Sequence, residues 1–185
     1  MLKNSATEYG LVSKTLHWLM AAIILGLIFV GIYMADLPME TAEEKQYAFQ
    51  FYDLHKSFGV VAFALIILRL VWIPISPAPQ LPSAFAPKER MMVKALQGLL
   101  YLLMLVMPIS GMVMSNAGGH PINFFGMGNL PALIGENEGL AEIAHEVHEI
   151  MGWTILVVII LHMAGAIKHR LKGKGGETDI LKRML

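Results

Sequence analysis

Residues 16–35 read LHWLMAAIILGLIFVGIYMA, a run without a single charged side chain. A helix needs about 20 mostly apolar residues to cross a hydrocarbon core that is roughly 30 Å thick. The run is longer than the hydrophobic region of a cleaved signal peptide, and no small-residue cleavage motif follows it at residues 36–38. We therefore expect a retained membrane span here.

Three further apolar stretches follow, at about 54–73, 92–115 and 139–168. Of the 185 residues, 56% are apolar and 15% are charged, whereas about a quarter of the residues of a soluble domain are charged. Pro108 interrupts the third stretch, and membrane helices tolerate such a kink. The sequence predicts an all-α integral membrane protein, a four-helix bundle that forms a single transmembrane domain over residues 1–185.

The charged residues are divided unequally between the two sides of these spans. The side with the N-terminus, the connection between the second and third spans and the C-terminal tail holds every Lys and Arg except Lys45 and Lys56, if Arg69 and Lys94 near the span ends are counted with it. The opposite side carries Asp36, Glu40, Glu43, Glu44, Asp53, Glu136, Glu138, Glu142, Glu146 and Glu149. Because Lys and Arg collect in cytoplasmic loops, we expect both termini in the cytoplasm. The balanced net charge argues against a nucleic-acid-binding protein.

The chain has no cysteine. Its absence excludes disulfides, thiolate nucleophiles, iron–sulfur clusters, cysteine-based zinc sites and a covalently attached c-type haem. Any metal ion has to be held by His, Met or carboxylate side chains.

Four histidines lie in the predicted spans or at their ends, namely His17, His55, His148 and His162. An ionisable side chain within a span is a functional candidate. His148 and His162 are fourteen residues apart, so they share one helix face at a separation of about 21 Å. Depth in the membrane then matches His162 with His17 and His148 with His55. Such pairs on facing helices suit the iron of a haem, whereas zinc requires three or four converging ligands.

Two neighbours of these histidines are further candidates. Gly59 follows His55 by one turn, where a missing side chain would let a flat porphyrin approach the backbone; packing of small residues between helices explains it equally well. Arg69 lies about 21 Å along the helix from His55, level with the other pair. There it could bind a haem propionate or extend to the membrane interface.

The remaining histidines have different expected roles. His145 lies one turn from His148 and is the alternative ligand at that depth. His169 is expected near the cytoplasmic interface, close to a propionate or a quinone, and His120 is expected to be solvated. Two rival functions use the same residues: a His-lined metal transporter and a structural membrane anchor. The transporter would need carboxylates inside the membrane, and the first three spans contain none.

Several short motifs occur in order along the chain. They are KTLHW at 14–18, LHKSFG at 54–59, PISG at 108–111, GGHPINFFG at 118–126, the histidines at 148 and 162, and LKRML at 181–185. With these motifs the whole chain resembles the bacterial cytochrome b561 family of small, four-helix, dihaem membrane cytochromes.

The resemblance implies two haems b with His17, His55, His148 and His162 as the axial ligands. It also implies a place in the bacterial inner membrane and electron transfer between a periplasmic donor and membrane quinone, with ubiquinone as the expected partner. One branch of the family resembles a superoxide oxidase, although the loop between residues 115 and 149 has no Lys or Arg to attract an anion. The alternative is a haem-b subunit that serves a separate soluble oxidoreductase.

Overall fold

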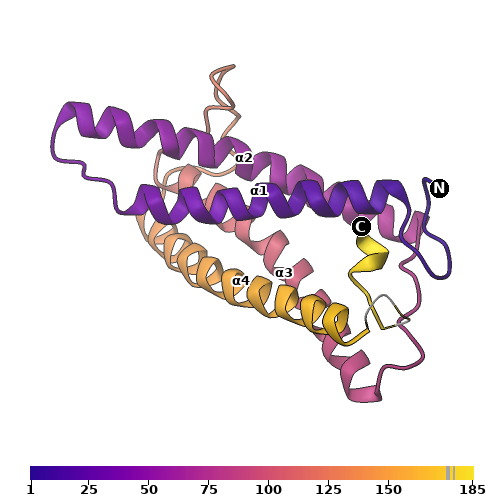
Figure 1. Ribbon diagram of the computed structural model, residues 1–185. Coiled ribbons are helices and arrows are strands. Elements are labelled where there is room, and N and C mark those ends of the chain that lie inside the picture. The colour runs from indigo at the N-terminus through magenta and orange to yellow at the C-terminus, as the bar shows by residue number, and fades with distance from the viewer. Residues whose placement is uncertain (174–175, 177) are drawn as a thin grey trace.

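The computed structural model describes residues 1–173, 176 and 178–185. Its helices are α1 (Leu11–Ala35), α2 (Ala42–Ile75), α3 (Pro87–Ala117), α4 (Glu138–Gly173) and the short 3₁₀ helix η1 (Lys182–Met184) (Figure 1). The described residues form no strand beyond one isolated bridge between Asn123 and Asn129. The predicted all-α fold with four membrane helices is confirmed.

The outer surfaces of the four long helices are apolar. All four are long and apolar enough to cross a bilayer. Large side chains such as Phe29, Leu68 and Leu161 are more than half exposed. A helix that is apolar around its whole circumference needs lipid or protein on every side, and this small bundle leaves most of that surface for lipid.

The helices extend beyond the predicted spans. The largest extension is in α2, which begins at Ala42 although the predicted span begins at about residue 54. Thr41 starts it with a capping box: its hydroxyl accepts from the Glu44 N–H, and the Glu44 carboxylate accepts from the Thr41 N–H. Pro87 occupies the first turn of α3, where its missing N–H costs nothing.

An apolar layer lies midway along the bundle. Leu103 of α3 packs with Ile155 and Val158 of α4, and Ile24 and Ile28 of α1 pack against them. The closest backbone packing joins α1 to α2, α2 to α3 and α3 to α4. Between the described parts of α4 and the pair α1 and α2, side chains rather than close backbone packing make the contacts.

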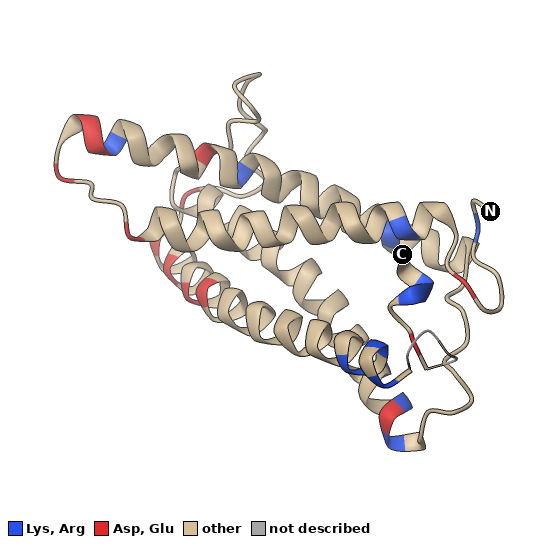
Figure 2. Ribbon diagram, in the orientation of Figure 1, with Lys and Arg blue, Asp and Glu red and all other residues tan. Residues whose placement is uncertain are grey.

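The two ends of the bundle differ in charge (Figure 2). We call the end where α1 finishes and α2 begins the acidic end, because Asp and Glu gather there. Both termini and most of the Lys and Arg lie at the opposite end, which we call the basic end.

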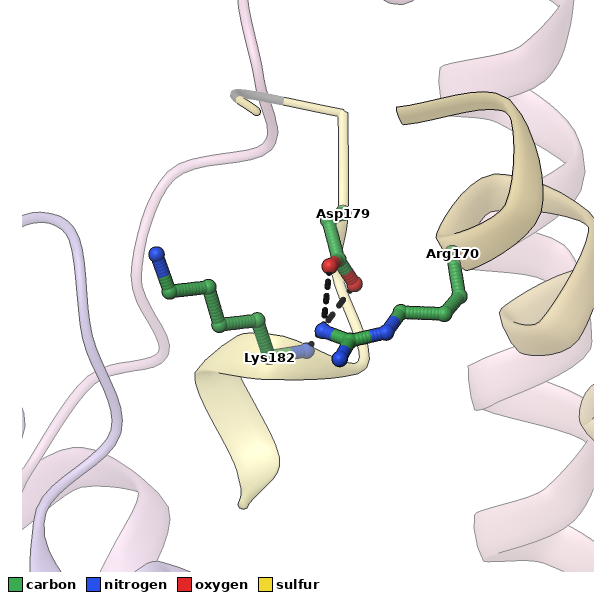
Figure 3. Close-up of polar contacts among 3 residues, drawn as sticks. All are labelled: Arg170, Asp179 and Lys182. Atoms are coloured by element: carbon green, nitrogen blue, oxygen red, sulfur yellow. Dashed lines mark hydrogen bonds and ion pairs between the residues drawn. The ribbon is translucent and has the colours of Figure 1, made fainter. Parts of the chain in front are cut away.

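The C-terminal segment folds back onto the basic end. Arg170 of α4 forms an ion pair with the buried carboxylate of Asp179, which also accepts from the backbone N–H of Lys182 (Figure 3). Lys14 and the Trp18 indole of α1 donate to the carbonyls of Leu185 and Met184. The segment is thereby attached to both α4 and α1.

Candidate functional site

Four histidine rings face one another in two pairs. The ring of His17 on α1 lies opposite that of His162 on α4, with centroids 6.2 Å apart. The ring of His55 on α2 lies opposite that of His148 on α4, with centroids 6.3 Å apart. The structure thus brings together the two pairs that the depth argument matched, one towards each end of the bundle.

The spacing within each pair fits one metal ion between two imidazoles. Two imidazole nitrogens that bind a first-row metal from opposite sides lie about 4 Å apart, and the ring centres, each about one ångström further out, are then about 6 Å apart. The donor set of both pairs therefore fits the two axial positions of a haem iron.

Hydrogen bonds fix the orientation of His148. Its Nδ1 lies 3.2 Å from the Met107 carbonyl oxygen and 3.0 Å from the Ser110 hydroxyl, which itself donates to the same carbonyl. A carbonyl oxygen can only accept, so this arrangement places the ring proton on Nδ1. The lone pair of Nε2 is then available to a metal, and the Nδ1 contacts are the outer-shell partners that ligand histidines usually have.

Two glycines make room for the rings at the acidic end. A Cβ on Gly31 of α1 would lie 3.1 Å from Cε1 of His55, and a Cβ on Gly111 of α3 would lie 3.0 Å from Cε1 of His148. Any larger residue would push the ring away. The buried Nδ1 of His55 makes no well-formed hydrogen bond among the described residues, although the backbone of Leu27 on α1 lies near enough to act on the ring.

Gly59 lies on the open side of α2. A Cβ there would meet no atom within 4 Å. The close approach of a neighbouring helix, which was the alternative explanation for this glycine, is therefore not what the structure contains. The backbone at Gly59 is accessible to a flat group beside His55.

Arg69 of α2 is held by α3 at the level of the basic-end pair. Its Nε donates to the Tyr101 hydroxyl at 3.0 Å, and its guanidinium carbon lies 5.7 Å from the centre of the Tyr101 ring. The guanidinium is close enough to act electrostatically on both His17 and His162. Tyr9, in the segment before α1, lies beside this group, and burial together with Tyr101 raises the pKa of its hydroxyl.

The other three histidines lie apart from the facing pairs. Nδ1 of His145 lies 3.3 Å from the sulfur of Met114 on α3, so at the acidic end it is the ring of His148 that faces His55. His169 stacks on the buried ring of Phe85 at 4.5 Å. His120 is exposed in the connection between α3 and α4.

Among the described residues, no three His, Cys, Asp or Glu side chains converge as a metal ion held only by protein would require. Each facing pair therefore offers two protein ligands, fewer than the three or four that a zinc site requires. The two-ligand pairs instead suit a metal whose other ligands come from its own macrocycle.

The sequence analysis missed the partners that support the histidines. Gly31 and Tyr101 were not singled out, and Ser110 and Gly111 appeared only within the PISG motif. One signal was present: a small residue in a span at the depth of a neighbouring span's histidine indicates room for a ring.

Comparisons with known proteins identify the family of the chain. The sequence profile described as "Prokaryotic cytochrome b561" matches residues 8–185. "Cytochrome b561 homolog 2" of Escherichia coli (strain K12) is 32% identical over 182 residues, which cover 98% of this chain and 93% of that protein. This chain therefore belongs to the prokaryotic cytochrome b561 family, bacterial membrane proteins that bind haem b and transfer electrons.

Proposed function

We propose that the protein binds two haems b, one between His17 and His162 and one between His55 and His148. The observation that carries this proposal is the pair of facing rings, separated in each case by the space that one iron atom needs. A bound haem supplies a one-electron Fe(III)/Fe(II) couple whose potential depends on its ligands, charges and burial.

The chain's own residues orient and tune these groups. The Met107 carbonyl and the Ser110 hydroxyl hold the His148 ring in position, and the open backbone at Gly59 leaves room for a porphyrin edge. Arg69, fixed by Tyr101, offers its remaining N–H groups to a propionate at the basic end.

We further propose that electrons pass through the bundle between a periplasmic donor at the acidic end and ubiquinone. This orientation places both termini in the cytoplasm of a cell with an inner membrane. His148 and His162 are about 21 Å apart along α4, and Ile155 lies midway between them in the apolar layer, so water is kept out of the intervening space. Superoxide is a candidate donor, and a haem-b subunit for a separate soluble oxidoreductase is the alternative.

The test is a reduced-minus-oxidised visible spectrum of the purified protein with haem quantified per chain, repeated on His148→Ala and His162→Ala. We expect two haems b in the parent protein and about one in each variant. His120→Ala and His145→Ala are matched controls that should keep both haems. A parent protein without haem would overturn the proposal, and retention of two haems by His148→Ala together with loss of one by His145→Ala would move the ligand to His145.

Turnover of the purified protein separates the two electron-transfer functions. Reduction of a ubiquinone analogue by superoxide with the protein alone would support the periplasmic-donor function. Reduction that occurs only when a soluble oxidoreductase is added would favour the alternative.

A further inference from the structure

The connection between α3 and α4 contains a tight hairpin over residues 122–130. Its base is the bridge between Asn123 and Asn129, and Leu130 N–H donates to the Ile122 carbonyl. Figure 1 shows this connection crossing to α2 and projecting sideways from the bundle, across the helix axes rather than along them. The tip, residues 124–128, reads FFGMG and has no polar side chain.

Ser57 fastens the hairpin to α2. This serine is buried; its hydroxyl donates towards the carbonyls of Asp53 and Asn123 and accepts from the Phe125 N–H at 3.0 Å. Phe125 has a φ of 51°, a left-handed conformation that costs a non-glycine residue about 1 kcal/mol or more. Its ring packs edge-on against Phe58, with centroids 5.1 Å apart. These contacts hold a strained tip in one place on α2.

The tip lies on the membrane side of the aromatic residues at the acidic end. Tyr33, Tyr47 and Phe51 pack together there, and tyrosine and tryptophan mark the interface of a bilayer with water. Phe58 is seven residues further along α2, about 10 Å nearer the middle of the bundle. The hairpin that packs against it is therefore at the depth of the outer boundary of the hydrocarbon.

Most of the backbone N–H groups of the tip are satisfied without water. Four consecutive amides have partners within the protein: Phe124 donates to the Gly128 carbonyl, Phe125 to Ser57, Gly126 to the Asn123 side chain and Met127 to the Phe124 carbonyl. A loop in water does not need this, whereas backbone groups in lipid do. Yet the side chains of Phe125 and Met127 are 42% and 75% exposed.

We propose that this hairpin tip is inserted into the bilayer at the acidic end, with acyl chains against Phe125 and Met127. It would act as an interfacial anchor beside α2, where Ser57 holds it two residues from His55. This role does not depend on which electron donor the protein uses. The apolar tip, its depth, its sideways direction and its bonded N–H groups support lipid as the neighbour.

The absence of cysteine makes a direct test possible. A spin label on Met127→Cys, in vesicles of phosphatidylcholine and phosphatidylglycerol, reports its collision rates with oxygen and with a water-soluble nickel chelate. Phe29→Cys, 73% exposed in the second half of α1, is the lipid control, and Glu142→Cys, exposed near the start of α4, is the water control.

We expect the Met127→Cys label to resemble the lipid control, with nickel collisions several-fold below those of Glu142→Cys. Collision rates like those of Glu142→Cys would overturn the proposal. An immobilised label that neither reagent reaches would also overturn it, because the tip would then contact protein, such as a second copy of the chain.

Discussion

The two histidine rings at the acidic end each lie against a glycine of a neighbouring helix, and these contacts permit a sharp test. Alanine at Gly111 would place a Cβ 3.0 Å from the His148 ring, and alanine at Gly31 would place one 3.1 Å from the His55 ring. In a helix, Gly→Ala alone is stabilising by roughly 0.5–1 kcal/mol. Any loss of haem in these variants would therefore arise from the displaced ring.

We expect Gly111→Ala and Gly31→Ala each to lose or perturb one of two haems, seen as a lower haem-to-protein ratio or an altered low-spin signal in electron paramagnetic resonance. Gly98→Ala is the matched control, because a Cβ there meets nothing within 4 Å. Unchanged spectra in both variants would show that these rings do not carry the metal.

Arg69 permits a prediction about redox potential. Its positive charge lies near His17 and His162 and disfavours the more positive ferric state. A unit charge about 10 Å from the iron, at an effective dielectric constant of about 20, contributes between about 1 and 2 kcal/mol, or roughly 60 mV for a one-electron couple. Arg69→Gln should lower the potential of one haem by that order and leave the other nearly unchanged.

Tyr101→Phe should shift the same haem in the same direction by less, because Arg69 keeps its charge but loses a hydrogen-bond partner. Lys94→Gln is the control, because it removes an exposed positive charge from the basic-end part of α3. A spectroelectrochemical titration measures all three variants. Equal shifts in both haems would contradict the assignment of Arg69 to one centre.

At the scale of elements, the apolar runs predicted four helices but not their full lengths. The first turns of α2 were missed because charged and polar residues from Glu43 to Asp53 interrupt the apolar pattern, although Thr41 and Glu44 form a capping box that marks a helix start. The hairpin could not be predicted from periodicity. Its fold depends on Ser57, which lies 66 residues away in the chain from Asn123.

Ser57→Ala should loosen the hairpin while leaving α2 intact. Removal of the hydroxyl leaves the Phe125 N–H and the Asn123 carbonyl without this partner, at a cost of about 1–3 kcal/mol when such groups are buried. We expect faster hydrogen exchange in residues 122–130, measured by mass spectrometry. Thr154→Ala removes a hydroxyl that bonds within its own helix and should leave this exchange unchanged. Equal protection of residues 122–130 in Ser57→Ala and in the parent protein would show that the Ser57 hydroxyl is not needed to hold the hairpin.

At the scale of the whole molecule, the pairing of the histidines followed from two distances along helices. Fourteen residues on α4 set the separation of the two rings, and the up-and-down path of the chain brought His17 and His55 to the matching levels. The sequence could not decide between His145 and His148, because they are only one turn apart. The structure distinguishes their positions by their contacts with α3: the His145 ring lies against the Met114 sulfur, and the His148 ring lies against the Met107 carbonyl.

The unequal ends of the bundle predict its direction in the membrane. Most Lys and Arg lie with the termini at the basic end, and positively charged segments remain on the cytoplasmic side during insertion. In intact cells, a membrane-impermeant maleimide should label Glu40→Cys, at the acidic end, and should label Thr7→Cys only after lysis; both positions are exposed. The cysteine-free parent protein is the blank. The reverse pattern would place the acidic end in the cytoplasm, and the centre beneath it would then accept electrons from a cytoplasmic donor instead of a periplasmic one.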